Sequence, residues 1–540
     1  MSRRTILRLG LVGLAALVLL GAGVAYHSAG KCRGGGSTCT GARPKPTRPK
    51  SPQPKPGVYI AESARGSARG NRCDNAHGVA WFNNPAHWAA RPGSARPGGR
   101  IRPGVTVYLC GTISTPLHAQ GSGVPGTPIS VYWGQGAKLS SPNWAGGAAF
   151  STNGHSYLKL NGGGHGLIEA TALGTDLPDR GQHAAGIQAW NCNGCTIENL
   201  TIANLYVHTS PSDTTVDQTQ DNAIRFSGSN LTIANNTIHD VGWALFADWA
   251  NGNANDSIHG NNIYNIDHGF ASTSEFPGGS IGPIYFYRNN LHDYANWDTP
   301  TDAYHHDGLH CYTSDNGAGP SHYAGLYIYD NTFGGDTGSN MTAQIFIEGG
   351  TGSGATPCAD STSKIWIFNN VGSVSKGVYN GVFGVFSGSP QVLNNTLIGA
   401  NSRAGVGYLS ATGVSGEDFR NNVITSANQL IVVESKGSFT TGAPNYNVYA
   451  NGGDNSFVCA GNYYSFGQFQ AWRACVGGDA QSRRIATARL STTGVPESGS
   501  TLRDTGTNLT SLCSGGLPAL CRDIAGRPRP TQSPWNAGAY

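Results

Sequence analysis

A recurring asparagine motif is the feature that most constrains the fold of this 540-residue chain. The hexapeptide NLTIAN occurs at 199–204 and again at 230–235. Shorter motifs, in which Asn or Asp precedes an Asn, begin at Asn235, Asn261, Asn289, Asp330, Asn369, Asn394 and Asn421. Their second residues are 26, 28, 41, 39, 25 and 27 residues apart. Repeats of this length indicate a solenoid of small stacked units.

Short segments that alternate apolar and polar residues lie between the motifs and predict β-strands. They begin at Ala223, Ala244, Gly269, Gly308, Gln344, Gly381, Gly405 and Leu430. We expect each strand to pair in parallel with its copy in the next repeat, so that alternate side chains fill a narrow core. Asn tolerates the left-handed bend between strands, and its amide can bond the next Asn of the stack. A propeller or a sandwich fits less well, because neither explains the spacing and the asparagines together.

Two C-terminal segments add a family resemblance. AWRACVGGDAQS at 471–482 resembles the Trp…Gly-Asp-Ala-x-Ser segment of secreted bacterial β-helix proteins, and RDIAGRPRPTQSPWNAGAY at 522–540 resembles their closing Asp…Gly-x-x-Arg-Pro…Gly-Ala-Tyr sequence. With the Asn-rich repeats, residues 103–540 resemble the right-handed parallel β-helix, or pectin-lyase-like, family. The resemblance implies an all-β solenoid with inserted loops on one face. It implies no single activity, because the family includes polysaccharide lyases, glycoside hydrolases, epimerases and binding proteins.

The N-terminal residues predict export. Residues 1–29 join a basic start, SRRTILR, to an apolar run, which is typical of a twin-arginine-like export signal, with a membrane anchor as the alternative. Residues 30–57 are Pro-rich and basic and predict an extended linker that can tether the body to a membrane or cell wall. We expect a cap region at 58–102, the parallel β-helix at 103–450, and its C-terminal end and cap at 451–540.

The twelve cysteines, an even number, indicate an oxidising compartment and an extracellular or cell-surface location. The sequence alone leaves the pairing open, but short spacings suggest Cys32–Cys39, Cys459–Cys475 and Cys513–Cys521. Cys311 and Cys358 lie in two adjacent repeats that carry insertions, which suggests a bridge between neighbouring rungs, with two separate buried thiols as the alternative. Cys192 and Cys195 form a single C-x-x-C, which favours a structural clip or a turn over zinc or redox chemistry.

The distribution of charge argues against nucleic-acid binding. Residues 1–70 hold twelve Lys or Arg and one acid, whereas the rest of the chain holds 23 basic and 30 acidic residues. An acidic body is a poor match for a phosphate backbone. The most acidic zone, 181–363, contains eighteen acids, ten histidines, only Arg225 and Arg288, and no lysine. We therefore expect the site in this zone.

Two adjacent long intervals, 41 and 39, imply insertions between Leu291 and Asp330 and between Thr332 and Asn369, and the segment DAYHHDGLHCY at 302–312 lies in the first of them. Such insertions tend to lie on the binding face of a solenoid. Strand alternation turns the following residues inward: Ile224, Phe226, Leu245, Ala247, Leu309, Cys311, Ile345 and Ile347. It turns four polar residues outward as the floor of a groove: Arg225, Asp248, His310 and Glu348. His306 should share the face of His310, while the direction of Asp307 stays open.

Four functional interpretations of the site remain open. A glycoside hydrolase needs paired carboxyl groups, and the candidates for catalysis are Asp307, Glu348, Asp248 and His310. The candidates for substrate binding are Arg225, His306, Tyr312, Asp267, His268, Trp243 and Trp297, with Asp267 as a reserve acid. A polysaccharide lyase would lack lysine here, although the acids can bind Ca²⁺. A transition-metal site from His305, His306, Asp307 and His310 is weakened because strand positions four apart lie about 13 Å apart. A non-catalytic carbohydrate-binding protein is the fourth alternative. Hydrolysis of a polysaccharide is the leading expectation.

Overall fold

The computed structural model describes residues 57–89, 100–144, 147–173, 184–205, 221–248, 254–274, 279–294, 305–313, 319–338, 341–349, 357–376, 378, 380–399, 405–425 and 427–540. The chain divides into two compact units, Met1–Gln53 and Pro54–Tyr540, and the description below concerns the second. The predicted export segment, nearly all of the linker, the Cys32–Cys39 pair and Trp297 lie outside the described residues. No helix within the described ranges is long and apolar enough to cross a membrane.

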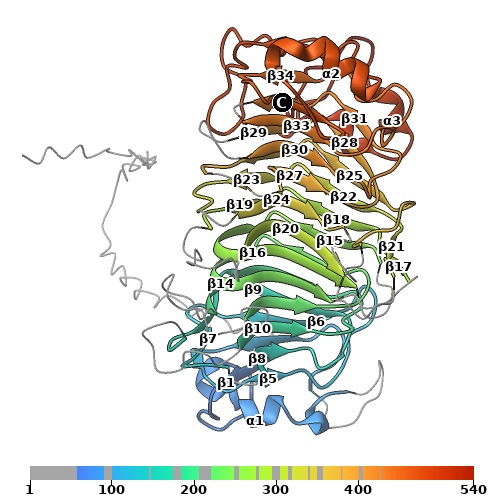
Figure 1. Ribbon diagram of the computed structural model, residues 1–540. Coiled ribbons are helices and arrows are strands. Elements are labelled where there is room, and N and C mark those ends of the chain that lie inside the picture. The colour runs from blue at the N-terminus through green and yellow to red at the C-terminus, as the bar shows by residue number, and fades with distance from the viewer. Residues whose placement is uncertain are drawn as a thin grey trace, which may run out of the picture. The chain divides into compact units, whose positions relative to one another are not determined.

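Parallel strands stack rung upon rung into three sheets that run along the solenoid (Figure 1). Sheet 1 contains β1 Val58–Ala61, β3 Thr106–Leu109, β6 Ile129–Trp133, the first half of β9 Leu158–Ala170, the first half of β11 Thr196–Leu205, β13 Thr232–Ala234, β15 Asp256–His259, β18 Ile284–Tyr287, β22 Leu326–Tyr329, β25 Lys364–Phe368, β28 Ser389–Leu393 and β31 Asp418–Arg420. The short strand β2 His77–Gly78 also pairs with β1.

Sheet 2 shares β9 and β11 with sheet 1, because these two strands continue around the corner between the sheets. It contains β4 Thr112–Ile113, β7 Lys138–Ser141, the second halves of β9 and β11, the first halves of β14 Thr237–Asp248 and β16 Asn262–Ser274, β19 Asn290–His292, β23 Thr332–Gly334, β26 Val371–Ser373, β29 Thr396–Ile398, β32 Val423–Thr425, β34 Val448–Ala450 and β37 Arg483–Ile485.

Sheet 3 carries the candidate site. It contains β5 Leu117–His118, β8 Gly147–Ser151, β10 Ala184–Ala189, β12 Asn222–Phe226, the second halves of β14 and β16, β20 His306–Thr313, β24 Met341–Ile347, β27 Phe383–Val385, β30 Val406–Ser410, β33 Gln429–Val433 and β35 Phe457–Cys459, with β36 Asn462–Tyr464 antiparallel at the end. A separate parallel pair joins β17 Ser280–Ile281 to β21 His322–Tyr323. The predicted all-β parallel β-helix is confirmed.

The asparagine motifs build a buried ladder along one corner of the stack. The ladder residues are Asn236, Asn261, Asn289, Asn331, Asn370, Asn395, Asn422 and Asn447, and each side-chain amide donates to the Oδ1 of the next at 2.9–3.2 Å. The residue before a ladder position adopts positive φ, as Asn235 and Asp330 do. Both predicted roles of asparagine are thus confirmed. The ladder residue is the second residue of most motifs, but it is the first residue, Asn261 or Asn289, in two repeats.

The interior follows the predicted alternation. All eight residues expected to face inward on β12, β14, β20 and β24 are at most 1% exposed. Phe270 of β16 stacks on Phe286 of β18 across the core, with ring centroids 5.1 Å apart. The alternate side chains of β12, β14, β20 and β24 therefore point outward from sheet 3.

Short helices lie at the two ends of the stack. The helix α1 Val79–Phe82 lies at the N-terminal end, where Phe82 packs on Phe150 of β8. At the other end, α2 Phe469–Val476 places Trp472 so that its indole donates to Asp479 at 3.0 Å. Asp479 also accepts from the last ladder residue at 3.2 Å, so the recognised Trp…Gly-Asp segment terminates the ladder. A third helix, α3, spans residues Thr510–Ser514. Because β1 pairs with β3, sheet 1 already begins within the segment expected to be a cap.

Five disulfides connect the described residues. The expected pairs Cys311–Cys358, Cys459–Cys475 and Cys513–Cys521 are bonded, and Cys192–Cys195 is a clip. The fifth pair, Cys73–Cys110, was not anticipated.

Candidate functional site

One glycine within β16 and one within β20 decide where the side chain before each of them points. A Cβ on Gly308 would meet the carbonyl oxygen of Gln344 and the ring of Phe333, so the Gly308 position faces the crowded interior. Leu309 also faces the interior, and two successive inward positions break the strand alternation. Asp307 therefore projects toward the same side as His310, three residues later. Gly269 on β16 occupies the equivalent crowded position and turns His268 outward in the same way.

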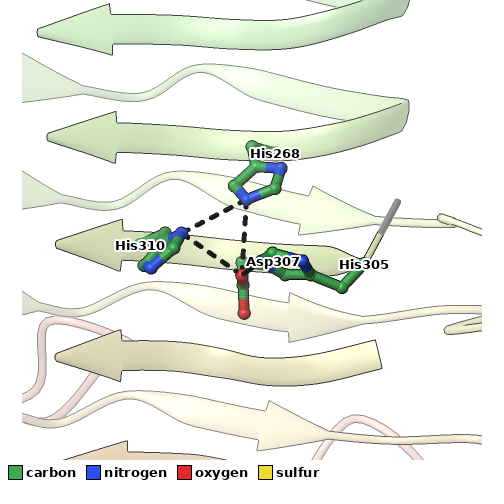
Figure 2. Close-up of side chains that lie close together, drawn as sticks. All are labelled: His268, His305, Asp307 and His310. Carbon is green, nitrogen blue, oxygen red and sulfur yellow. Dashed lines mark hydrogen bonds and ion pairs between the residues drawn. The ribbon is translucent and has the colours of Figure 1, made fainter. Parts of the chain in front are cut away.

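Four side chains converge at this break: His268, His305, Asp307 and His310, which we call the His–Asp centre (Figure 2). Three imidazole nitrogens approach the single oxygen Asp307 Oδ2, namely His268 Nε2 at 3.4 Å, His305 Nε2 at 3.2 Å and His310 Nδ1 at 3.5 Å. The nitrogens His268 Nε2 and His310 Nδ1 are 3.3 Å apart. Among the described residues, only these four are grouped closely enough to hold a metal ion.

A second carboxylate lies behind the centre. Asp267 is fully buried, and its Oδ2 is 2.5 Å from His268 Nδ1 and accepts a hydrogen bond from Trp243 Nε1 at 3.2 Å. Its other oxygen is 3.2 Å from His306 Nδ1. These contacts hold the His268 ring with its Nε2 directed at Asp307.

The buried charges of the centre shift each other's pKa values. Burial raises the pKa of Asp307, but the charge of His310 and the contacts with His268 and His305 outweigh burial and hold the pKa below 3.8. The pKa of Asp267 is likewise lowered, because His268 and His306 outweigh its burial. Burial lowers the pKa of His268, yet the two carboxylates raise it to about 10. Asp307 in the centre and Asp267 behind it are therefore both ionised at neutral pH.

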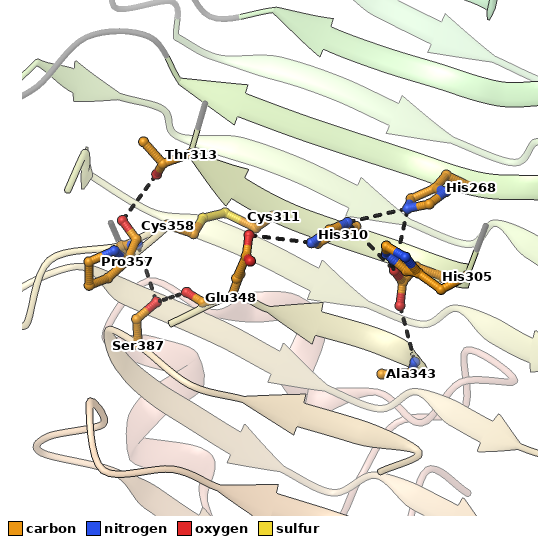
Figure 3. Close-up of polar contacts among 12 residues, drawn as sticks. His268, His305, His310, Cys311, Thr313, Ala343, Glu348, Pro357, Cys358 and Ser387 are labelled. Atoms are coloured by element: carbon orange, nitrogen blue, oxygen red, sulfur yellow. Dashed lines mark hydrogen bonds and ion pairs between the residues drawn. A yellow bond between two sulfur atoms is a disulfide. The ribbon is translucent and has the colours of Figure 1, made fainter. Parts of the chain in front are cut away.

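Glu348 lies at the open side of the centre. Its Oε2 is 3.6 Å from His310 Nε2, and its side chain is 34% exposed. The backbone of Glu348 is held in place because its carbonyl oxygen accepts from Ser387 Oγ at 2.6 Å and from the Cys358 N–H at 3.0 Å (Figure 3). The Cys311–Cys358 disulfide ties this segment to β20. His310 thus lies between the enclosed Asp307 and the accessible Glu348.

Aromatic and charged side chains continue along sheet 3 on both sides of the centre. The cross-strand partners of His310 form one row, Arg225, Phe246, Ala271 and Phe346. Phe346 stacks on the His310 ring with centroids 4.9 Å apart. Arg225 pairs with Asp248 at 3.1 Å and lies over the Trp190 ring, 4.6 Å from its centroid. Tyr312 follows His310 by two residues on β20 and contacts Trp243, with ring centroids 6.0 Å apart.

The structure brings together most of the predicted site residues, with two corrections. Arg225 and Asp248 are in contact, and so are His310 and Glu348, as expected for a groove floor. The prediction that His306 shares the outward face of His310 is wrong, because the two successive inward positions Gly308 and Leu309 turn His306 to the interior, where it is fully buried. Asp267 is also fully enclosed, so neither side chain is accessible to a substrate.

Sequence reasoning missed the partnership of His268 with Asp307. A signal was present, because both residues directly precede the glycine that opens an aligned strand, GFAST or GLHCY. Aligning these two segments stacks His268 on Asp307, which is the register that β16 and β20 adopt. His305, expected only as part of a metal alternative, completes the cluster from the residue before β20.

Comparisons with known proteins give only distant structural likenesses. No family model matches the chain, and no curated protein matches it. Similar solved structures include pectate lyase Pel9A, with a TM-score of 0.42 and 15% sequence identity over 89% of this chain and 95% of that one. The GH136 lacto-N-biosidase from Eubacterium ramulus has a TM-score of 0.39 and 10% identity over 80% of this chain and 68% of that one. The catalytic unit of the GH87 α-1,3-glucanase from Streptomyces thermodiastaticus strain HF3-3 has a TM-score of 0.38 and 11% identity over 80% of this chain and 69% of that one. At such low identities these likenesses assign no activity to this chain.

Proposed function

We propose that the protein is an extracellular enzyme that binds an extended polysaccharide along sheet 3 and cleaves it beside Glu348. The observation that carries the proposal is the accessible Glu348 carboxylate 3.6 Å from an imidazole, next to an enclosed cluster of two further carboxylates. Carboxyl groups held at a groove are the usual proton-transfer groups of glycoside cleavage. The five disulfides support a location outside the cell.

The aromatic row supports a polymeric sugar as the substrate class. Flat rings suit the apolar faces of sugar rings, and the partly exposed Tyr312 lies beside the His310 ring, with centroids 5.2 Å apart, whereas Phe346 is only 8% exposed. Sheet 3 continues in both directions from this point, so a chain longer than one sugar can follow its rungs. Trp243 contributes less to such a surface, because it is only 6% exposed and its indole N–H is bonded to Asp267.

The catalytic roles that we propose do not rely on a pair of exposed carboxyl groups. Asp248 lies three strands from Glu348, which is about 14 Å at the usual strand spacing and too far for a catalytic carboxyl pair. Asp307 is fully buried and its pKa is lowered, so it does not fit a proton donor. We therefore assign proton transfer to Glu348, and we assign to His310 the positioning of that carboxylate.

Hydrolysis is favoured over β-elimination. A lyase acting on uronic acids must neutralise the substrate carboxylate, and residues 181–363 contain no lysine. Arg225 is three strands from His310 along sheet 3 and is already paired with Asp248. Among the described residues of this zone, no arginine is thus placed at Glu348.

The test is a screen of the full-length protein against neutral and acidic polysaccharides, in which reducing ends and ultraviolet absorbance of unsaturated products are followed together. Glu348→Gln should lose the activity, whereas Glu434→Gln should keep it, because Glu434 follows β33 as Glu348 follows β24 but faces no imidazole among the described residues. Reducing ends without ultraviolet absorbance support hydrolysis, and both together indicate a lyase. If no polysaccharide is cut, or if Glu348→Gln cleaves at the parent rate, the proposal fails; polymer retention without cleavage would indicate a binding protein.

A further inference from the structure

The His–Asp centre contains buried polar atoms that hydrogen bonding does not satisfy. Among the described residues, Asp307 Oδ2 and His305 Nε2 make no hydrogen bond of normal geometry, although both atoms are shielded from solvent. Leaving a buried carboxylate oxygen unpaired is costly, and folded proteins rarely tolerate it without a reason. The three nitrogens around Asp307 Oδ2 lie at 3.2–3.5 Å, at or beyond the long end of an N–H···O hydrogen bond.

The separations match the ligand shell of a tetrahedral metal ion. Nitrogen and oxygen ligands lie about 2.0–2.2 Å from zinc, so neighbouring corners of a tetrahedron are about 3.3–3.6 Å apart. Four of the six separations among the ligand atoms are 3.2, 3.3, 3.4 and 3.5 Å, and all four atoms lie within 4.8 Å of one another. The centre is therefore open by the amount that an ion would require.

The surrounding contacts orient each ligand toward the middle. His268 turns its Nδ1 to Asp267, which leaves Nε2 for the centre. The Ala343 N–H donates to Asp307 Oδ1 at 3.1 Å and leaves Oδ2 for the centre. With His310 Nδ1 in the centre, its remaining ring nitrogen faces Glu348 Oε2 at 3.6 Å. Ligands whose second polar atom is held by a carboxylate or the backbone are typical of metal sites.

The donor atoms select the kind of ion. Three imidazoles and one carboxylate suit a divalent transition metal, whereas Ca²⁺ and Mg²⁺ take oxygen ligands. The strand-spacing objection to a metal site does not apply here, because His268 comes from the neighbouring strand and the break at Gly308 brings Asp307 toward His310.

We propose that the His–Asp centre binds one divalent transition-metal ion through three imidazole nitrogens and Asp307 Oδ2, with Zn²⁺ as the best match. Binding of the ion stands independently of any activity. Its position beside His310 and Glu348 makes it part of the same site, and only that part of the inference rests on the proposed function.

Metal binding can be measured directly on the full-length protein. Protein stripped with a chelator and dialysed is titrated with ZnCl₂, and with CaCl₂ in parallel, by calorimetry, and bound metal is counted by elemental analysis. We expect one Zn²⁺ per chain and no Ca²⁺ binding at this centre. Replacement of zinc by Co²⁺ should give the intense visible absorption of a tetrahedral nitrogen–oxygen site.

Variants assign the ion to the centre. His305→Gln removes a partly exposed ligand, so the variant should still fold. Asp267→Asn removes only the carboxylate that orients His268 and should weaken Zn²⁺ binding by about 10–100-fold. His305→Gln should weaken Zn²⁺ binding more than Asp267→Asn does, because it removes a ligand itself. His292→Gln is the matched control, since His292 also pairs with a neighbouring aspartate, at 2.6 Å, but lies on sheet 2. Its affinity should equal that of the parent protein.

Two outcomes overturn the inference: stripped protein that takes up no Zn²⁺, or Zn²⁺ affinity that is unchanged in both His305→Gln and Asp307→Asn. Glu348→Gln separates the two proposals, because it should keep the ion and lose cleavage. Cleavage that persists in protein unable to bind metal refutes a role of the ion in the reaction but leaves the proposed function standing. Metal binding without cleavage of any polysaccharide refutes the proposed function and leaves the ion site standing.

Discussion

Removing one amide from the middle of the asparagine ladder should destabilise the protein far more than removing an exposed asparagine. Asn331 is fully buried, and its side chain donates to Phe286 O at 2.9 Å and to Asn370 Oδ1 at 3.0 Å. Its Oδ1 accepts from the backbone and the side-chain amide of Asn289, at 2.9 and 3.1 Å. In Asn331→Ala, both Asn289 donors and the Phe286 carbonyl lose these partners.

The magnitude follows from these contacts. Each of these three buried groups left unpaired costs about 1–3 kcal/mol, so the variant should lose roughly 3–9 kcal/mol of unfolding free energy. Asn370 adds little to this loss, because its Oδ1 still accepts from the Asn331 backbone N–H at 3.0 Å. The control is Asn290→Ala, which removes an exposed amide bonded to Asn262 at 2.8 Å and should cost under about 1 kcal/mol.

The assay is urea unfolding followed by circular dichroism and tryptophan fluorescence on both variants and the parent. A loss for Asn331→Ala that is no greater than the loss for Asn290→Ala would refute the reasoning. It would mean that water replaces the missing amide and that the ladder contributes little to stability.

Two further predictions concern pH and the disulfide next to the site. Burial raises the pKa of Glu417 from 4.5 to about 7, although its carboxylate accepts hydrogen bonds from Ser410 and Tyr408. Between pH 4.5 and 7 the carboxyl group ionises in the unfolded chain but stays protonated in the folded protein, so the unfolding free energy should fall as the pH rises. The expected loss is roughly 3 kcal/mol, at about 1.4 kcal/mol per pKa unit. Glu417→Gln should therefore match the parent at pH 4 and exceed it at pH 8 in urea unfolding, and parallel pH profiles would contradict this. Replacing Cys311 and Cys358 by alanine opens a bridge of sequence separation 47, which should cost up to about 4 kcal/mol and lower any cleavage that depends on Glu348; an unchanged unfolding midpoint would argue against the bridge.

The groove floor was predictable to the extent that strand alternation holds. Arg225 and His310 lie in one cross-strand row because every second side chain of a strand points to the same face and the rungs are in register. The same rule failed for His306 and left Asp307 undecided, because the glycine before Leu309 adds a second inward position that period-two alternation cannot represent.

The sequence by itself determined the repeat, the parallel stacking and the inward residues of the rungs. These features depend on local conformation and on spacing along the chain: left-handed φ at residues such as Asn235, and buried amides at regular intervals. Only the tertiary structure decided the membership of the His–Asp centre. His268 and Asp307 are 39 residues apart and meet because β16 and β20 pair at one particular register. That register depends on how the Gly269 and Gly308 positions pack against the core and the next rung, and this packing exists only once the rungs are assembled.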